Sequence, residues 1–117
     1  MGLRGLQAWL RPYAEWCLEV ANYYGVPVVV TSTYRSWSEQ QELRTRWERG
    51  QSRWPANRPG DSAHNYGLAW DSTVPSWAQT WWNDVRRAAG FEVLSNDEIH
   101  AQYPRWRDLV RGEKTGA

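Results

Sequence analysis

Helical and extended hydrophobic patterns alternate along this chain, and their order restricts the folds that it can adopt. Apolar residues recur every three or four positions over residues 3–24, with charged residues between them, which predicts an amphipathic helix ending at Gly25. The β-branched run 26–32 is almost continuously hydrophobic and predicts a strand that is buried on both faces or lies under a helix. A capping-box pattern at residues 36–39 then begins a second predicted helix, which ends at Gly50.

The second half of the chain predicts shorter elements after a loop. Residues 51–63 are rich in Pro, Gly, Asn and Asp, and loops of such length usually serve a site. The predicted elements after this loop are a strand at 66–74, a helix from a second capping-box pattern at 76–79 to about Ala89, two short strands at 91–94 and 98–103, and a last helix from Pro104. This order of elements predicts an α+β domain.

Length and composition indicate one globular domain. The 117 residues are expected to share a single core over residues 1–117, with a frayed tail at about 112–117, and to act as a monomer. The 41% of hydrophobic and 23% of charged residues exclude a disordered, collagenous or coiled-coil chain. Ten Trp and six Tyr carry both an apolar ring and a polar atom, so they suit clefts as well as cores.

Charge and cysteine content exclude several function classes. The net charge of +1 argues against a nucleic-acid-binding domain. The basic cluster between Arg44 and Arg58 is an exception, and we interpret it as a solvated helix end and loop. Cys17 is the only cysteine, which rules out an intrachain disulfide and a CxxC motif. Residues 1–12 hold no apolar run of signal-peptide or membrane-span length, so we expect a cytoplasmic protein on synthesis.

Both histidines of the chain lie near carboxylates. His64 is followed by Asp71, and His100 ends the segment Asp97-Glu98-Ile99-His100. Two histidines and one carboxylate are a common ligand set for catalytic zinc, which keeps a fourth position open for water. A carboxylate outside the ligand set can then act as general base on that water. On spacing alone, structural or surface histidines remain the alternative interpretation.

The segment Ser62–Asp71, SAHNYGLAWD, resembles the SxHxxGxAxD motif of the D-Ala-D-Ala peptidase family of zinc enzymes at every fixed position. Further matching pieces follow the family order over residues 30–102; they are Ser32-x-Tyr34-Arg35-Ser36 with Gln40 and Leu43, Pro59-Gly60, Gly90-Phe91 and Asp97-x-x-His100. The family includes D-alanyl-D-alanine carboxypeptidases and the L-alanyl-D-glutamate endopeptidases of phage lysins. The resemblance implies a hedgehog/D-Ala-D-Ala peptidase fold, with a small antiparallel sheet flanked by helices.

The resemblance also implies a Zn2+ site and a catalytic base. His64, Asp71 and His100 match the zinc ligands, and Asp97 matches the base, with Glu98 as its rival. The odd spacing of Asp97 and His100 would turn their side chains to opposite faces of a regular strand. We therefore predict a bend or bulge at Glu98-Ile99 that lets both face the ion.

Three more residues of the matching pieces are candidates for substrate binding. The planar guanidinium of Arg35 suits a carboxylate or a developing oxyanion, and the equivalent family residue is implicated in both roles; an ion pair with Glu39 is the alternative. Ser62 either touches substrate or braces its loop through side-chain to backbone hydrogen bonds. Gln40 faces either the cleft or the surface of its own helix.

The resemblance implies a zinc metallopeptidase that hydrolyses the peptidoglycan stem peptide, as an L-Ala-D-Glu endopeptidase or a D-Ala-D-Ala carboxypeptidase. The expected partner is the peptidoglycan peptide, with neither nucleic acid nor a membrane span. Because residues 1–12 do not resemble a signal peptide, we interpret the chain as a phage-type lysin that acts on the bacterial cell wall after release. The alternative is a non-catalytic, zinc-stabilised binding domain on the same scaffold, against which the acid at position 97 argues.

Overall fold

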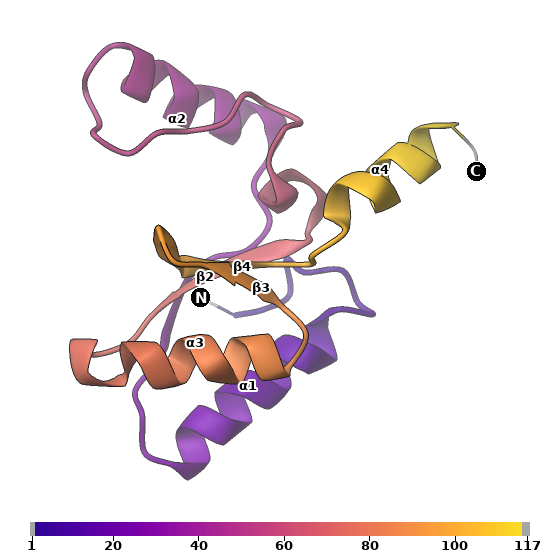
Figure 1. The fold of residues 1–117 in the computed structure, drawn as a ribbon. Coiled ribbons are helices and arrows are strands. Elements are labelled where there is room, and N and C mark those ends of the chain that lie inside the picture. Colours follow the sequence, from indigo (N-terminus) through magenta and orange to yellow (C-terminus); the bar gives the residue numbers. More distant parts are fainter. Residues whose placement is uncertain (1, 116–117) are drawn as a thin grey trace.

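A four-stranded antiparallel sheet lies at the centre of the computed structural model, which describes residues 2–115 (Figure 1). The strands are β1 (Val29–Ser32), β2 (Ala69–Thr73), β3 (Glu92–Leu94) and β4 (Asp97–Gln102). Their spatial order is β1-β2-β4-β3, and each neighbouring pair is antiparallel. The structure therefore confirms the predicted α+β class with a small antiparallel sheet.

Helices lie on both sides of this sheet (Figure 1). Helices α1 (Arg11–Tyr23) and α3 (Gln79–Ala88) cover one face, and α2 (Trp37–Glu48) lies beyond the other. Helix α4 (Trp106–Thr115) contacts the 3-10 helix η1 (Ala63–Tyr66). Helix α4 includes residues 112–115 of the tail that was expected to fray, and residues 116–117 lie outside the described residues. None of the described helices is long and apolar enough to span a membrane.

The N-terminal helix is shorter than its apolar spacing predicts. Helix α1 begins at Arg11, with Pro12 in the first turn, where a missing N–H breaks no helical hydrogen bond. The preceding residues form turns that nevertheless bury Leu3, Leu6 and Leu10. The spacing of these leucines thus reflects burial in the core without helix formation.

The two capping-box predictions have different outcomes. Ser36 Oγ accepts a hydrogen bond from the backbone N–H of Glu39, and the Glu39 carboxylate accepts one from the N–H of Ser36, which confirms the first box. The second is wrong, because residues 76–78 form the 3-10 helix η2 (Ser76–Ala78) and α3 begins at Gln79 without a side-chain cap. Pro75 precedes η2 and directs the chain out of β2.

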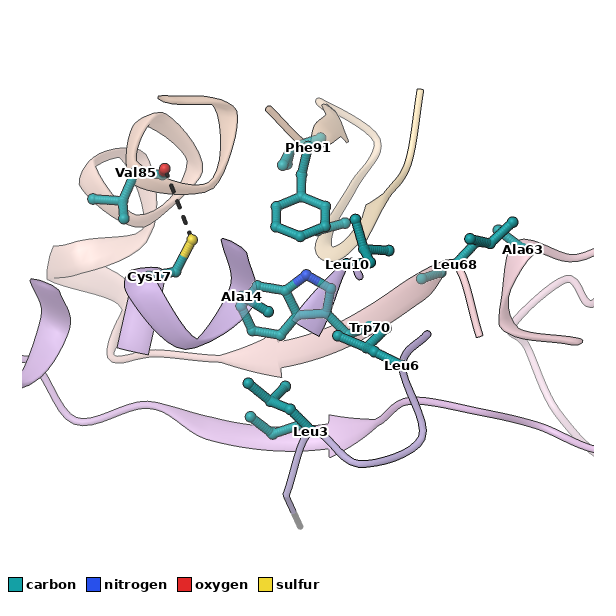
Figure 2. Close-up of a cluster of buried hydrophobic side chains, with 14 of the residues drawn as sticks. Leu3, Leu6, Leu10, Ala14, Cys17, Ala63, Leu68, Trp70, Val85 and Phe91 are labelled. Carbon is teal, nitrogen blue, oxygen red and sulfur yellow. Dashed lines mark hydrogen bonds between the residues drawn. The ribbon is translucent and has the colours of Figure 1, made fainter. Parts of the chain in front are cut away.

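The hydrophobic core lies between the sheet and helices α1 and α3 (Figure 2). Trp70 of β2 and Trp82 of α3 are both 0% exposed and pack edge to face, with ring centroids 6.0 Å apart. Phe91 also packs edge to face against Trp70, with ring centroids 5.6 Å apart. Trp82 Nε1 donates to Ser72 Oγ at 2.9 Å, so the polar atom of this buried ring is satisfied.

Candidate metal centre

Three side chains, from η1, β2 and β4, converge on the sheet face away from α1 and α3. Asp71 Oδ1 lies 3.2 Å from His64 Nε2 and 3.1 Å from His100 Nδ1. One ligand atom from each of the three residues lies within 4.8 Å of the others. The structure therefore brings together the three predicted zinc ligands as a group that could hold a metal ion.

Strand register and a short helix set this arrangement. Asp71 of β2 and His100 of β4 are partners in the antiparallel pairing, so their side chains project from the same face. His64 lies in η1, where Ser62 is the N-cap and accepts a hydrogen bond from the His64 backbone N–H at 3.3 Å. Gly67 ends η1 with φ 68°, a left-handed conformation that favours glycine. The Ser and Gly of the motif thus place His64 beside the start of β2.

Each imidazole has a partner on the side away from Asp71. His64 Nδ1 lies 2.6 Å from the carbonyl oxygen of Thr33, and His100 Nε2 lies 2.8 Å from Gln102 Oε1. Because these oxygens only accept, the two nitrogens carry the protons in the neutral rings, and the lone pairs face Asp71. This is how protein partners orient histidines that bind metals. Sequence reasoning did not identify Thr33 or Gln102.

The charges of the cluster also suit a cation. Burial would raise the pKa of Asp71, but its hydrogen bonds with His100 and His64 outweigh burial and hold the pKa below its usual value. Burial would lower the pKa of His100, and its hydrogen bonds with Asp71 and Gln102 raise it instead. The carboxylate of Asp71 thus favours positive charge at the His100 nitrogen that faces it. Two imidazole nitrogens with one carboxylate are donors that fit zinc.

Arg35 borders the cluster. Its Nη2 lies 3.7 Å from Asp71 Oδ2 and donates to Ser32 Oγ at 3.2 Å. The carboxylate of Glu39, the alternative partner, is held by the capping box of α2. The Arg35 side chain is 19% exposed, so part of the guanidinium remains accessible beside the candidate ligands.

The structure places Gln40 and Ser62 in supporting positions. Gln40 is 2% exposed; its Oε1 accepts from Arg35 Nη1 at 3.1 Å, and its Nε2 donates to the carbonyl of Asn57 at 2.8 Å. It therefore points toward Arg35 and away from the helix surface. Ser62 is buried, and its hydroxyl accepts from the backbone of η1, which is the bracing alternative.

The two candidate bases have different surroundings. The β3–β4 pairing is irregular, because Glu92 pairs with Gln102 while Leu94 pairs with Asp97, in the region where the bulge was predicted. Glu98 Oε2 accepts a hydrogen bond from Asn83 Nδ2 of α3 at 2.6 Å. Asp97 is exposed, and its charge is one of the smaller influences that raise the pKa of His100 against the effect of burial. Glu98 is thus tied to α3, and the assignment of Asp97 as the base stays a prediction.

Comparison with known families gives the class of protein. Residues 6–104 match the VanY family, described as D-alanyl-D-alanine carboxypeptidase. The chain belongs to this family of peptidoglycan peptidases, whose activity is hydrolytic. The comparison with curated proteins gave no match.

Solved structures share the fold at low sequence identity. VanYB in complex with D-alanine-D-alanine is 20% identical, with a TM-score of 0.70, over 95% of this chain and 78% of that chain. A mutant of the vancomycin resistance D,D-pentapeptidase VanY in complex with Zn(II) is 21% identical, with a TM-score of 0.67, over 95% of this chain and 79% of that chain. The Serratia marcescens L-Ala D-Glu endopeptidase ChiX is 24% identical, with a TM-score of 0.59, over 92% of this chain and 86% of that chain. The peptidase fold is thus shared by enzymes described as cleaving different bonds.

Proposed function

We propose that this chain is a zinc-dependent peptidase of the peptidoglycan stem peptide, with the D-Ala-D-Ala bond as its first candidate substrate. The observation that carries the proposal is the convergence of His64, Asp71 and His100, whose ligand atoms lie within 4.8 Å of one another. Membership of the VanY family supports the choice of bond. The Zn(II) complex of a structural neighbour supports the choice of metal.

The chain's own residues would hold the ion and prepare the site for it. When bound, Zn2+ would polarise the scissile carbonyl and lower the pKa of the attacking water. Thr33 and Gln102 keep the histidine lone pairs directed at the ion position. The low pKa of Asp71 keeps its carboxylate ionised at neutral pH.

Asp97 and Arg35 would carry the remaining steps. As general base, Asp97 takes a proton from the attacking water and delivers it to the nitrogen of the leaving amine. Glu98 is less suited to this role, because its carboxylate is bound to Asn83 of α3. Arg35, next to Asp71, is placed to stabilise negative charge that develops on the carbonyl oxygen of the substrate.

The test is digestion of purified peptidoglycan followed by mass spectrometry of the new termini, with and without a chelator. A D-Ala-D-Ala carboxypeptidase releases free D-Ala, whereas an L-Ala-D-Glu endopeptidase creates an amino terminus on D-Glu. We expect chelator-sensitive release of D-Ala, and release that is slower by roughly 100-fold or more from the Asp97→Asn variant. Zinc binding without any product from the wild-type protein would instead support the non-catalytic binding domain.

For the alternative in which the L-Ala-D-Glu bond is cut, we further propose a phage-type lysin that is made in the cytoplasm and reaches the bacterial cell wall after release. The substrate class supports this proposal, because peptidoglycan forms the bacterial cell wall. Trimming a terminal D-Ala leaves the wall mesh connected, whereas an L-Ala-D-Glu cut separates the stem peptide from the glycan. Loss of turbidity in permeabilised bacteria treated with wild-type protein, but not with Asp97→Asn, would support the lysin. D-Ala release without lysis would contradict it.

A further inference from the structure

Arg86 of α3 is a buried charge that the metal centre does not use. Its side chain is 0% exposed, and it lies on the face of the sheet opposite Asp71. Within the described part of the chain, no carboxylate lies within ion-pair distance of its guanidinium. Burying a cation without an ionic partner is costly unless hydrogen bonds compensate for the lost water, so its contacts are informative.

The guanidinium of Arg86 donates to four oxygens. Its Nη2 bonds the carbonyl of Glu98 at 2.6 Å and Asn83 Oδ1 at 2.6 Å, its Nη1 bonds the carbonyl of Ile99 at 3.3 Å, and its Nε bonds the carbonyl of Trp82 at 3.3 Å. Two of these oxygens are consecutive carbonyls of β4. Burial lowers the pKa of Arg86 to about 10, so the group remains protonated at neutral pH.

Asn83 completes a clamp on the same segment. Its Oδ1 accepts from Arg86, and its Nδ2 donates to the Glu98 carboxylate at 2.6 Å. Helix α3 therefore holds Glu98 by its backbone carbonyl through Arg86 and by its side chain through Asn83. We call Arg86 and Asn83 the α3 clamp.

The clamp acts where β4 departs from regular pairing. Glu92 pairs with Gln102 and Leu94 with Asp97, so the irregular stretch of β4 contains Glu98 and Ile99. The clamp holds the Glu98 side chain toward α3, and side chains of successive extended residues point to opposite faces. Asp97 is thereby directed toward the face that carries His100.

We propose that Arg86 is a positioning residue for Asp97: by binding the carbonyls of Glu98 and Ile99, it holds the irregular turn of β4 that brings Asp97 to the same face as His100. This proposal rests on the proposed function only in taking Asp97 as the general base. His100 is held separately by its pairing with Asp71 and by Gln102, so zinc binding does not depend on the clamp.

The test compares Arg86→Met and Arg86→Lys with the control Arg87→Met. Arg87 is the next residue of α3 and also donates to a strand carbonyl, that of Val93 in β3, at 2.8 Å. We expect Arg86→Met to lower kcat about tenfold to hundredfold with KM and zinc content unchanged, because small misplacement of a catalytic group has effects of that order. Arg86→Lys should recover part of the loss, and Arg87→Met should keep wild-type kcat.

Two measurements separate positioning from general stability. In the metal-free protein, Arg86→Met should speed amide hydrogen exchange at residues 97–99, and Arg87→Met should not. In the Asp97→Asn background, Arg86→Met should cause no further loss of kcat, because its effect passes through Asp97. If Arg86→Met does not fold, Arg86→Lys and Asn83→Ala replace it in the same double-mutant comparison with Asp97→Asn.

The failures are distinguishable. Wild-type kcat in the Arg86 variants, or a full additional loss in the Asp97→Asn background, overturns the positioning role alone. An Asp97→Asn variant with wild-type turnover overturns the base assignment of the proposed function and the positioning role with it.

Discussion

The two faces of the central sheet use the same strands for different purposes. On the face covered by α1 and α3, Trp70 and Ser72 of β2 are 0% exposed and pack with Trp82. Asp71 lies between them in sequence, points to the other face, and has a side chain that is 13% exposed. One face holds the core, and the other gathers polar groups whose lone pairs converge.

Stability and chemistry are therefore separated by a single alternation of side chains along β2. Burial of large rings provides most of the free energy of folding on the core face. The candidate ligands that converge on the other face suit a bound cation and do not form a packed apolar core. Substitutions on the core face should therefore lower stability, and those on the site face should lower zinc binding or turnover.

The largest expected effect belongs to the core face. Trp70→Ala should lower the free energy of unfolding by about 3–5 kcal/mol, because it removes a fully buried ring and leaves a cavity. Urea denaturation followed by circular dichroism measures this change. Trp77→Ala, at a ring that is 72% exposed, is the control and should change it by less than about 0.5 kcal/mol. Equal losses in the two variants would remove the distinction between the faces.

On the site face, Asp97→Asn should lower turnover by roughly 100-fold or more, the usual scale for losing a general base. The zinc content and the free energy of unfolding should stay at wild-type values, because Asp97 is exposed and is not a ligand. Steady-state kinetics on a stem-peptide substrate check this. Glu98→Gln should have a much smaller effect, and the assignment is wrong if that variant is the more impaired.

Gln102 tests the orientation of a ligand. Gln102→Leu should weaken zinc binding by about 10-fold to 100-fold, because His100 loses the acceptor that fixes its ring and tautomer. Competition with a chelator gives the affinity. The control is Gln41→Leu, whose amide donates to Thr45 on α2. Wild-type affinity in Gln102→Leu would show that the strand pairing alone orients His100.

Arg35→Lys keeps the charge and removes the planar pair of donors. If Arg35 meets the developing oxyanion, kcat and kcat/KM should fall together, by about tenfold. A rise in KM with kcat unchanged would indicate binding of a carboxylate in the ground state instead. Wild-type kinetics in both Arg35→Lys and Arg35→Ala would exclude Arg35 from the site.

The smallest effect at neutral pH concerns Cys17 in the core. Burial raises the pKa of its thiol to about 12, against 9.0 for an exposed thiol. The unfolded state loses this proton first, so stability is unaffected below about pH 9 and falls between pH 9 and 12, by up to about 1.4 kcal/mol per pH unit. In Cys17→Ala, the free energy of unfolding, measured by denaturation at several pH values between 8 and 11, should lack this fall. The same pH dependence of the free energy of unfolding in both proteins would show that the thiol ionises normally in the folded state.

Local sequence patterns predicted much of the fold and the candidate site. The capping box at Ser36 and the α+β class followed from local patterns, and the grouping of His64, Asp71 and His100 followed from the resemblance to the peptidase motif. The sequence also marks the start of α1, since proline is accepted within a helix only in the first turn, but the leucine spacing suggests an earlier start.

Contacts between distant segments were not predictable in this way. The partner of His64 is the backbone carbonyl of Thr33, and any residue type can supply a carbonyl at that position. The role of Gln102 depends on the register between β2 and β4. Arg86 looks like an ordinary polar residue of an amphipathic helix, and only the packing of α3 against β4 reveals its burial.

The most direct test of the separation between the two faces is the zinc content of the purified wild-type protein and of His64→Ala, Asp71→Ala and His100→Ala, with circular dichroism of each. We predict one zinc per wild-type chain, loss of stoichiometric zinc in all three variants, and wild-type secondary structure in each at low temperature, because the core face is unchanged. Undiminished zinc in the three variants, or their complete unfolding, would contradict the account.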